Sequence, residues 1–148
     1  MCIRDRAYRT DRLAIVVPHD HPLAALNEVL FSDVLDYDLI ALETGSSLMR
    51  IFTEKAVDFG KGLRLRVQVR SFEVVCRMVQ AGMGVGLLPF LAANFLSEAL
   101  HIEVRALADP WAVRQMLICV KRDRPQNLLL TRLLETLTAS QIHRNSPT

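Results

Sequence analysis

The chain has 148 residues, of which 51% are apolar and 23% charged, a composition typical of a globular domain and not of a disordered or fibrous chain. Its net charge of +2 is too small to indicate nucleic-acid binding by basic character alone. No apolar run approaches the ~20 residues of a membrane span, and the charged N-terminus lacks the apolar segment of a secretory signal. Three widely spaced cysteines predict no disulfide framework, so we expect a cytoplasmic protein with no membrane partner.

The first half of the chain alternates between strands and helices. A β-branched run over residues 12–18 ends at a proline and predicts a strand buried on both faces, and residues 39–43 predict a second one. Ser32 and Asp33 begin a short capped helix between them. A longer helix begins near Ser47 and ends at Gly60 and Gly62; its inward face is predicted to hold Leu48, Ile51, Phe52, Ala56 and Phe59.

The second half continues the alternation. Residues 63–70 alternate apolar and polar side chains, as a half-buried strand does. Ser71 is placed to cap the next helix, whose predicted inward residues are Val74, Val75, Met78 and Val79. The remaining segments are a strand at 85–89, a helix at 90–100, strands at 102–107 and 112–120, and a helix at 127–137. Together these elements predict an α/β fold with a largely parallel sheet.

Three glycines at alternate positions follow the helix that begins after Ser71. A dinucleotide-binding fingerprint places its glycines between a strand and a helix, whereas Gly82, Gly84 and Gly86 lie between a helix and a strand. We therefore interpret Gly82 as a helix stop with positive φ. Gly84 and Gly86 are interpreted as points where the backbone passes close to a neighbouring element.

Other candidates for chemistry have simpler structural interpretations. His19, Asp20 and His21 abut a proline in a predicted turn and lack a second cluster of ligands, so no metal site is predicted. Cys76 lies near an inward helix face without a base partner and is predicted to be a packed thiol. Three aspartates could be taken for paired acids: Asp33, Asp36 and Asp38. They stand where helix caps and turns need hydrogen-bond acceptors. The sequence predicts no catalytic residue and no cofactor.

One loop retains a functional interpretation. Thr44, Gly45, Ser46 and Ser47 follow a buried strand and precede a helix, where unpaired N–H groups and the positive end of the helix dipole favour an anion. The alternative is that Ser46 or Ser47 only caps the helix. Open α/β sheets bind ligands beyond the carboxyl ends of their strands, and Ser71 holds the equivalent position after its own strand. The two loops could converge on one small molecule.

The order of these segments resembles the effector-binding domain of LysR-type transcriptional regulators. The matching stretches are "DRLAIVVPHDHPLA" (11–24), the loop at 44–47 with its helix, "SFEVVCRMVQAGMGVGLLP" (71–89) and "WAVRQMLICVKR" (111–122) before a leucine-rich terminal helix. The resemblance extends from residue 11 to about residue 139, and its most specific part is the helix-glycine-proline stretch.

The resemblance implies a fold like that of the type II periplasmic binding proteins, with two α/β subdomains joined by two crossing strands. The chain would hold one complete subdomain (31–96) and part of the other: residues 11–18 would form the first crossing strand, and residues 102–139 would return to the first subdomain. Val17, Pro18 and Pro89 would lie at the hinge and cleft. Residues 1–10 are expected to be non-native or disordered, and residues 140–148 a disordered tail.

The resemblance also implies a function without catalysis. A small effector, a carboxylate or another anion, would bind to Thr44, Gly45, Ser46, Ser47 and Ser71. The full-length protein would be a homodimer or tetramer and would contact DNA through an N-terminal domain that does not precede residue 11. A solute-binding protein of a transporter is the alternative on the same fold. An enzyme on this fold would need a nucleophile, a base and an orienting group, and the sequence offers no such set.

Overall fold

The computed structural model describes residues 3–121 and 127–139. The chain forms two compact units: Arg12–Val113 is one, and the other combines Met1–Asp11 with Arg114–Thr148. The second half of the first strand and the strand after residue 102 pair within the sheet of the unit that holds residues 31–96. Ile3 to Thr10, within the range expected to be non-native or disordered, form the first half of a strand.

The larger unit is built on a mixed sheet in the order β3-β2-β4-β1-β5. The strands are β1 (Ile3–Pro18), β2 (Leu39–Leu42), β3 (Leu65–Val69), β4 (Val85–Pro89) and β5 (Ile102–Ala106). β2 pairs in parallel with β3 and β4, as the strand-helix-strand alternation predicted, while β1 runs antiparallel to both β4 and β5. A helix also lies between β1 and β2, so the local strand-helix-strand pattern did not reveal that β1 runs in the opposite direction.

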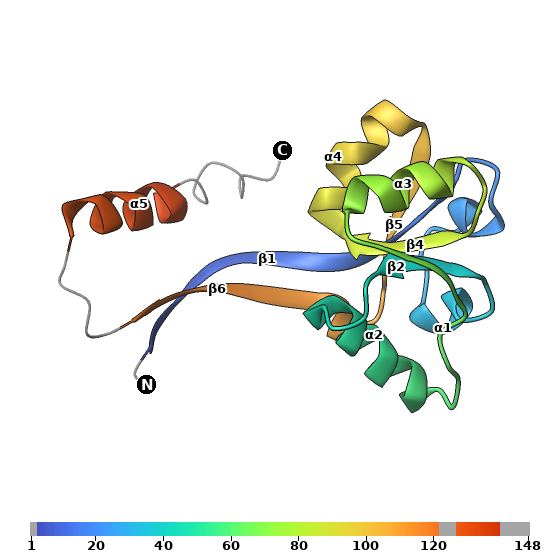
Figure 1. The fold of residues 1–148 in the computed structure, drawn as a ribbon, viewed down its shortest axis with the longest axis horizontal. Helices are drawn as coiled ribbons and strands as arrows, with labels where there is room; N and C mark the ends of the chain where they lie inside the picture. Colours follow the sequence, from blue (N-terminus) through green and yellow to red (C-terminus); the bar gives the residue numbers. More distant parts are fainter. Residues whose placement is uncertain (1–2, 122–126, 140–148) are drawn as a thin grey trace. The chain divides into compact units, whose positions relative to one another are not determined.

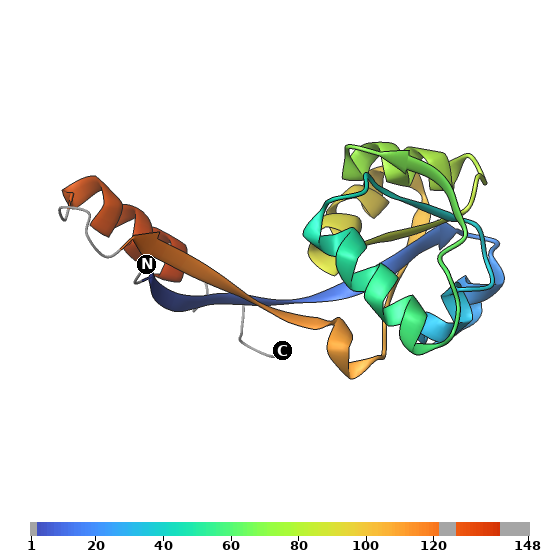
Figure 2. The same cartoon turned by 60° about the horizontal axis from the view of Figure 1, so that its bottom comes forward.

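Helices cover both faces of this sheet. α3 and α4 lie on one face, and α1 and α2 lie on the other (Figures 1 and 2). The helices are α1 (Phe31–Val34), α2 (Ser47–Asp58), α3 (Phe72–Gln80) and α4 (Phe90–Leu100), with short 3-10 turns at Pro22–Ala25 and Pro110–Ala112. Each of the predicted helices within residues 31–100 is confirmed.

The two faces hold separate cores. Leu13, Ile15 and Val17 of β1 point into the core under α1 and α2, whereas Val16 points into the core under α3 and α4. This confirms that β1 is buried on both faces. The first core centres on three rings: Phe31 lies 5.8 Å from Phe52 and 5.2 Å from Trp111 between ring centroids.

Three apolar residues that the sequence pattern places on buried faces are exposed: Phe59, Val74 and Leu65. Phe59 is 45% exposed because it stands at the C-terminal cap of α2. Val74 is 41% exposed, and the buried stripe of α3 runs instead through Val75, Cys76 and Val79. The helix is thus rotated by about one residue from the predicted orientation, because the docking of α3 on β4 and α4 sets its angle. Leu65 is 40% exposed because β3 is the edge strand and has a neighbour on one side only.

The three glycines behave as predicted. Gly82 follows α3 with a φ of 74°. A Cβ on Gly84 would lie 2.5 Å from the backbone oxygen of Asp38, and one on Gly86 would lie 2.8 Å from Val75 Cγ1. Both distances are shorter than any real side chain tolerates, so the close approach is confirmed.

The smaller unit contains the first half of β1, the strand β6 (Val113–Lys121), which pairs with β1, and the helix α5 (Leu128–Ala139). Within it, Arg114 donates to the carboxylate of the buried Asp11 at 3.2 Å. None of the α5 side chains is buried. Across residues 3–121 and 127–139, no helix has the length and apolar character needed to cross a bilayer. The predicted disordered tail at 140–148 lies outside the described residues.

Candidate functional site

The loop between β2 and α2 lies at the carboxyl edge of the parallel strands. Glu43 N donates to Val69 O at 3.0 Å, which brings the end of β2 beside the end of β3. An ion pair of 2.9 Å between Arg70 Nε and Glu43 Oε1 joins the same two ends. The polar residues that follow the two strands are therefore neighbours, as the sequence predicted for an open α/β sheet.

Ser46 caps α2. Its hydroxyl accepts from Met49 N at 3.1 Å, and its carbonyl accepts the first helical bond from Arg50 N at 3.2 Å. Of the four N–H groups that a helix start leaves free, the Ser46 hydroxyl satisfies that of Met49, and the Ser46 N–H donates to the Glu43 carbonyl at 3.4 Å. The amides of Ser47 and Leu48 lie between these two, and among the described residues no partner is recorded for them. The capping interpretation is thus confirmed for Ser46, while Ser47 remains available to a ligand.

Gly45 shapes the loop. Its φ of 101° lies in the region that favours glycine, and a Cβ there would have no heavy atom within 4 Å. The residue therefore serves the backbone conformation and not a close contact. The turn it makes places Thr44 ahead of the helix start.

Four of the predicted site residues line one pocket of about 640 Å³: Thr44, Gly45, Ser46 and Ser47. The remaining lining residues come from α2 and the start of β3: Met49, Arg50, Thr53, Glu54 and Leu65. This volume lies within the range of small-molecule sites. Ser71 is not part of this lining; its hydroxyl caps α3 by accepting from Val74 N at 3.4 Å.

Gln68 contacts a residue of this site, Thr44, and sequence reasoning missed it. Its side-chain amide lies on β3 within hydrogen-bond distance of Thr44, with 3.0 Å between Gln68 Nε2 and Thr44 Oγ1. The sequence did offer one signal, since Gln68 stands near the end of its strand just as Thr44 does. Only the parallel pairing of β2 with β3 brings the two together.

The two prolines assigned to the hinge lie at opposite edges of the sheet. Pro89 pairs with Leu13 at the carboxyl end of β4, the same edge as the loop at 44–47. Pro18 is at the other end of β1, where it pairs with Ile102, and Val17 before it is fully buried.

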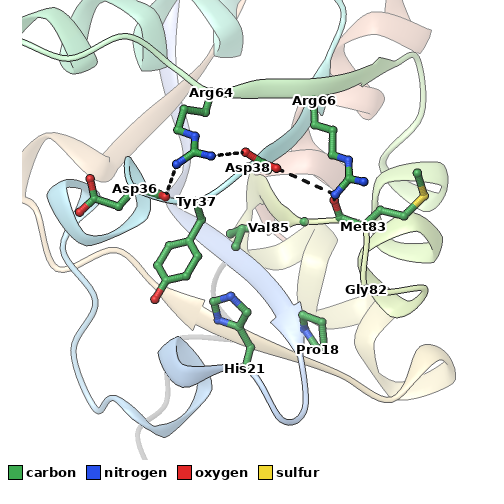
Figure 3. Close-up of a pocket in the computed structure, with 11 residues that line it drawn as sticks. Pro18, His21, Asp36, Tyr37, Asp38, Arg64, Arg66, Gly82, Met83 and Val85 are labelled. Atoms are coloured by element: carbon green, nitrogen blue, oxygen red, sulfur yellow. Dashed lines mark hydrogen bonds and ion pairs between the residues drawn. The ribbon is translucent and has the colours of Figure 1, made fainter.

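A second pocket, of about 320 Å³, lies at the edge where β2, β3 and β4 begin, and Pro18 is part of it (Figure 3). Asp38 stands between two arginines, 3.0 Å from Arg64 and 3.9 Å from Arg66. Arg64 also donates to the Asp36 carbonyl at 2.9 Å, and Arg66 to the Met83 carbonyl at 3.1 Å. These contacts join the segments that precede β2 and β4 to the beginning of β3, so the cluster holds the beginnings of the three strands together.

The opposite side of that second pocket is aromatic. His21 and Tyr37 meet edge to face with 4.7 Å between ring centroids. The His21 Nδ1 accepts from Leu23 N at 3.2 Å, which fixes the ring in its turn as the sequence predicted. Burial lowers the pKa of His21 despite the nearby charge of Asp20, so the ring is neutral at pH 7.

In the described part of the chain, residues that could bind a metal or act as a nucleophile are not brought together. Within residues 3–121 and 127–139, no three His, Cys, Asp or Glu side chains come together as metal ligands would. Cys76 is fully buried, and burial raises the pKa of its thiol to about 11. The prediction of a packed thiol is confirmed.

A mixed sheet with helices on both faces and a polar loop at its carboxyl edge is the arrangement of an α/β subdomain of the type II periplasmic-binding-protein fold. Residues 3–141 match the family described as LysR substrate binding domain. The chain therefore belongs to that family, and the recognition made from the sequence is confirmed.

Individual relatives agree with this assignment. An uncharacterized HTH-type transcriptional regulator of Methanocaldococcus jannaschii, MJ0300, is 31% identical over 120 residues, which cover 79% of this chain and 40% of that protein. The regulatory domain of CcmR from Synechocystis PCC6803, solved with 2-PG, superposes with a TM-score of 0.79 at 20% identity and covers 99% of this chain and 69% of that domain. The effector-binding domain of QuiR, solved with shikimate, gives a TM-score of 0.79 at 15% identity over 96% of this chain and 66% of that one. The chain thus spans less than half of the curated relative and about two thirds of the solved domains.

Proposed function

We propose that this chain is the effector-sensing part of a LysR-type transcriptional regulator and that it binds a small anionic metabolite at the loop of residues 44–47. The observation that carries the proposal is the presence of several donors in one pocket: the Thr44 and Ser47 hydroxyls and the Ser47 amide at the start of α2. Donors of this kind, with the positive end of the helix dipole, favour a negatively charged ligand.

The charges around the loop support an anion. Glu43 would repel one, but Arg70 neutralises it through the ion pair of 2.9 Å. Arg50 lines the pocket and lies 3.9 Å from Glu54, so its exposed guanidinium can turn toward a ligand. Shikimate, the ligand solved with the QuiR domain, is a carboxylate and shows which chemistry a neighbour of the same fold accepts.

The effector acts by shifting populations and not by chemistry. A ligand that binds one state of the regulator more tightly than another moves the equilibrium toward that state, which is how an effector alters a bound DNA complex. In this proposal the DNA contact belongs to a separate domain of the full-length protein, such as the HTH class named for the M. jannaschii relative. The regulator acts in the cytoplasm as a homodimer or tetramer.

Isothermal titration of the chain with shikimate and a panel of other small carboxylates tests the site. A double variant, Thr44→Val with Ser47→Ala, removes both hydroxyls while leaving the Ser46 cap intact, and we expect it to weaken binding about tenfold or more. Ser97→Ala is the matched control, since Ser97 is a half-buried serine of α4, away from the pocket, whose hydroxyl donates to the Asn94 carbonyl at 2.8 Å. Equal affinities of the double variant and the parent chain would refute the site.

A further inference from the structure

Gln68 contacts both ends of the segment that leads into the loop. Its Nε2 lies 3.3 Å from the Leu42 carbonyl oxygen and 3.0 Å from Thr44 Oγ1, and its Oε1 lies 3.3 Å from the same hydroxyl. The side chain reaches these groups because β3 lies beside β2, with Leu42 paired to Val69. One amide thus faces a backbone carbonyl and the predicted ligand-binding hydroxyl together.

The Leu42 carbonyl determines which way this amide is oriented. A carbonyl oxygen accepts hydrogen bonds and cannot donate one, so the nitrogen of the Gln68 amide must face it. The opposite orientation would place two acceptor oxygens against each other. With one N–H donated to Leu42, the other N–H of the same nitrogen is directed to Thr44 Oγ1 at the shorter of the two Gln68–Thr44 distances.

The orientation of the amide then sets the role of the Thr44 hydroxyl. Its oxygen accepts from Gln68, so its proton is left with the longer neutral contact to Gln68 Oε1. A charge-assisted bond to a carboxylate is about twice as strong as a neutral one, so an anionic ligand displaces that contact. The hydroxyl therefore meets a ligand as a donor.

We infer that Gln68 is a positioning residue that holds the Thr44 hydroxyl with its proton directed to a ligand acceptor, such as an oxygen of an ionised carboxylate or a phosphate. This inference rests on the proposed function. The Ser47 amide at the start of α2 is a second donor in the same pocket. Gln68 thus favours an acceptor group of the ligand at Thr44.

The first test needs no ligand. Three-bond NMR couplings report the Thr44 χ1 angle in the free chain, and we expect a single rotamer in the parent and rotamer averaging in Gln68→Leu. Gln80→Leu is the matched control, because Gln80 is an exposed glutamine at the end of α3. An unchanged, fixed Thr44 rotamer in Gln68→Leu would overturn the inference whatever the ligand.

The second test is a double-mutant cycle for shikimate binding, measured by isothermal titration with Gln68→Leu, Thr44→Val and the combination. Thr44→Val removes a hydrogen bond to a charged ligand and should weaken binding about tenfold. Gln68→Leu should cost roughly half as much binding free energy, which weakens binding about threefold. Because Gln68 acts through Thr44, the combined variant should bind no more weakly than Thr44→Val alone.

The outcomes separate the inference from the function on which it rests. If Thr44→Val weakens shikimate binding as expected and Gln68→Leu leaves it unchanged, the positioning role is overturned and the proposed site stands. Additive losses overturn it too, since they would show that Gln68 contacts the ligand directly. No shikimate binding, or binding indifferent to Thr44→Val, refutes the proposed site for this ligand and the donor role with it, while the rotamer measurement still decides whether Gln68 holds Thr44.

Discussion

The carboxylate of Asp109 accepts a hydrogen bond of 2.7 Å from the backbone N–H of Phe31, which lies 78 residues earlier in the chain. The same carboxylate accepts from the indole N–H of Trp111 at 3.2 Å. Asp109 is only 7% exposed, and the rings of Phe31 and Trp111 pack against each other beside it. One side chain thus satisfies the first amide of α1 and orients an aromatic ring of the core.

Asp109→Ala should therefore lower the free energy of unfolding by about 2 to 3 kcal/mol, because it leaves the buried Phe31 N–H without its acceptor. Urea denaturation of the variant and the parent chain measures this difference. Asp20→Ala, in the exposed turn after β1, is the control and should change stability by no more than about 0.5 kcal/mol. Equal losses for the two variants would contradict the structural role of Asp109.

Gly84→Val should cost about 2 kcal/mol or more. The φ of Gly84 is 156°, and a Cβ there would lie 2.5 Å from the Asp38 backbone oxygen. That oxygen also accepts from Val85 N at 2.9 Å, so it cannot move away without loss of the bond. Thermal melts test the prediction against Gly62→Val, where a Cβ would meet nothing within 4 Å. A Gly84→Val melt that matches the parent would show that the backbone there is free to adjust.

Glu103 should make the unfolding free energy depend on pH in the acid range. Hydrogen bonds from His19 and then Arg105 lower the pKa of Glu103 below its ordinary value of 4.5. A carboxylate with a lowered folded-state pKa stabilises the fold above its unfolded pKa, and this contribution is lost as the pH falls through the folded pKa. Its size should stay below about 1 kcal/mol because the pair is largely exposed.

Urea denaturation of the parent and of Glu103→Gln between about pH 3 and 7 measures that contribution. The two stability curves should differ at neutral pH and converge at the acid end, because the parent carboxylate is then protonated. A constant difference at every pH would indicate that the substitution acts through packing and not through the charge.

Cys76 should resist alkylation in the folded chain. Its thiol is fully buried, and burial raises its pKa to about 11, so almost none of the reactive thiolate is present near pH 8. Cys119 is exposed and serves as the internal control. Mass spectrometry after iodoacetamide treatment should locate the label on Cys119 and find it on Cys76 only after denaturation. Early labelling of Cys76 would mean that α3 opens readily from the sheet.

The features that the sequence predicted well are those that depend on neighbours along the chain. Ser46 and Ser71 cap their helices because capping needs only a hydroxyl two or three residues before a free amide. The end of α3 at Gly82 also depends only on neighbouring residues, because a glycine with positive φ ends a helix.

The features that escaped prediction depend on contacts between distant segments. The antiparallel direction of β1 is set by strands 70 or more residues away, such as β4 with its Leu13–Pro89 pair. The exposure of Val74 reflects how α3 docks on its neighbours. Gln68 reaches Thr44 across 24 residues, and nothing next to either residue in the sequence indicates that bond.

β1 belongs to both compact units. The boundary between them falls at Asp11 and Arg12, inside a continuous strand that contains neither glycine nor proline before Pro18. The return connection, between Val113 and Arg114, likewise lies within β6. The backbone therefore passes from one unit to the other twice, each time in extended strand conformation and not through a loop.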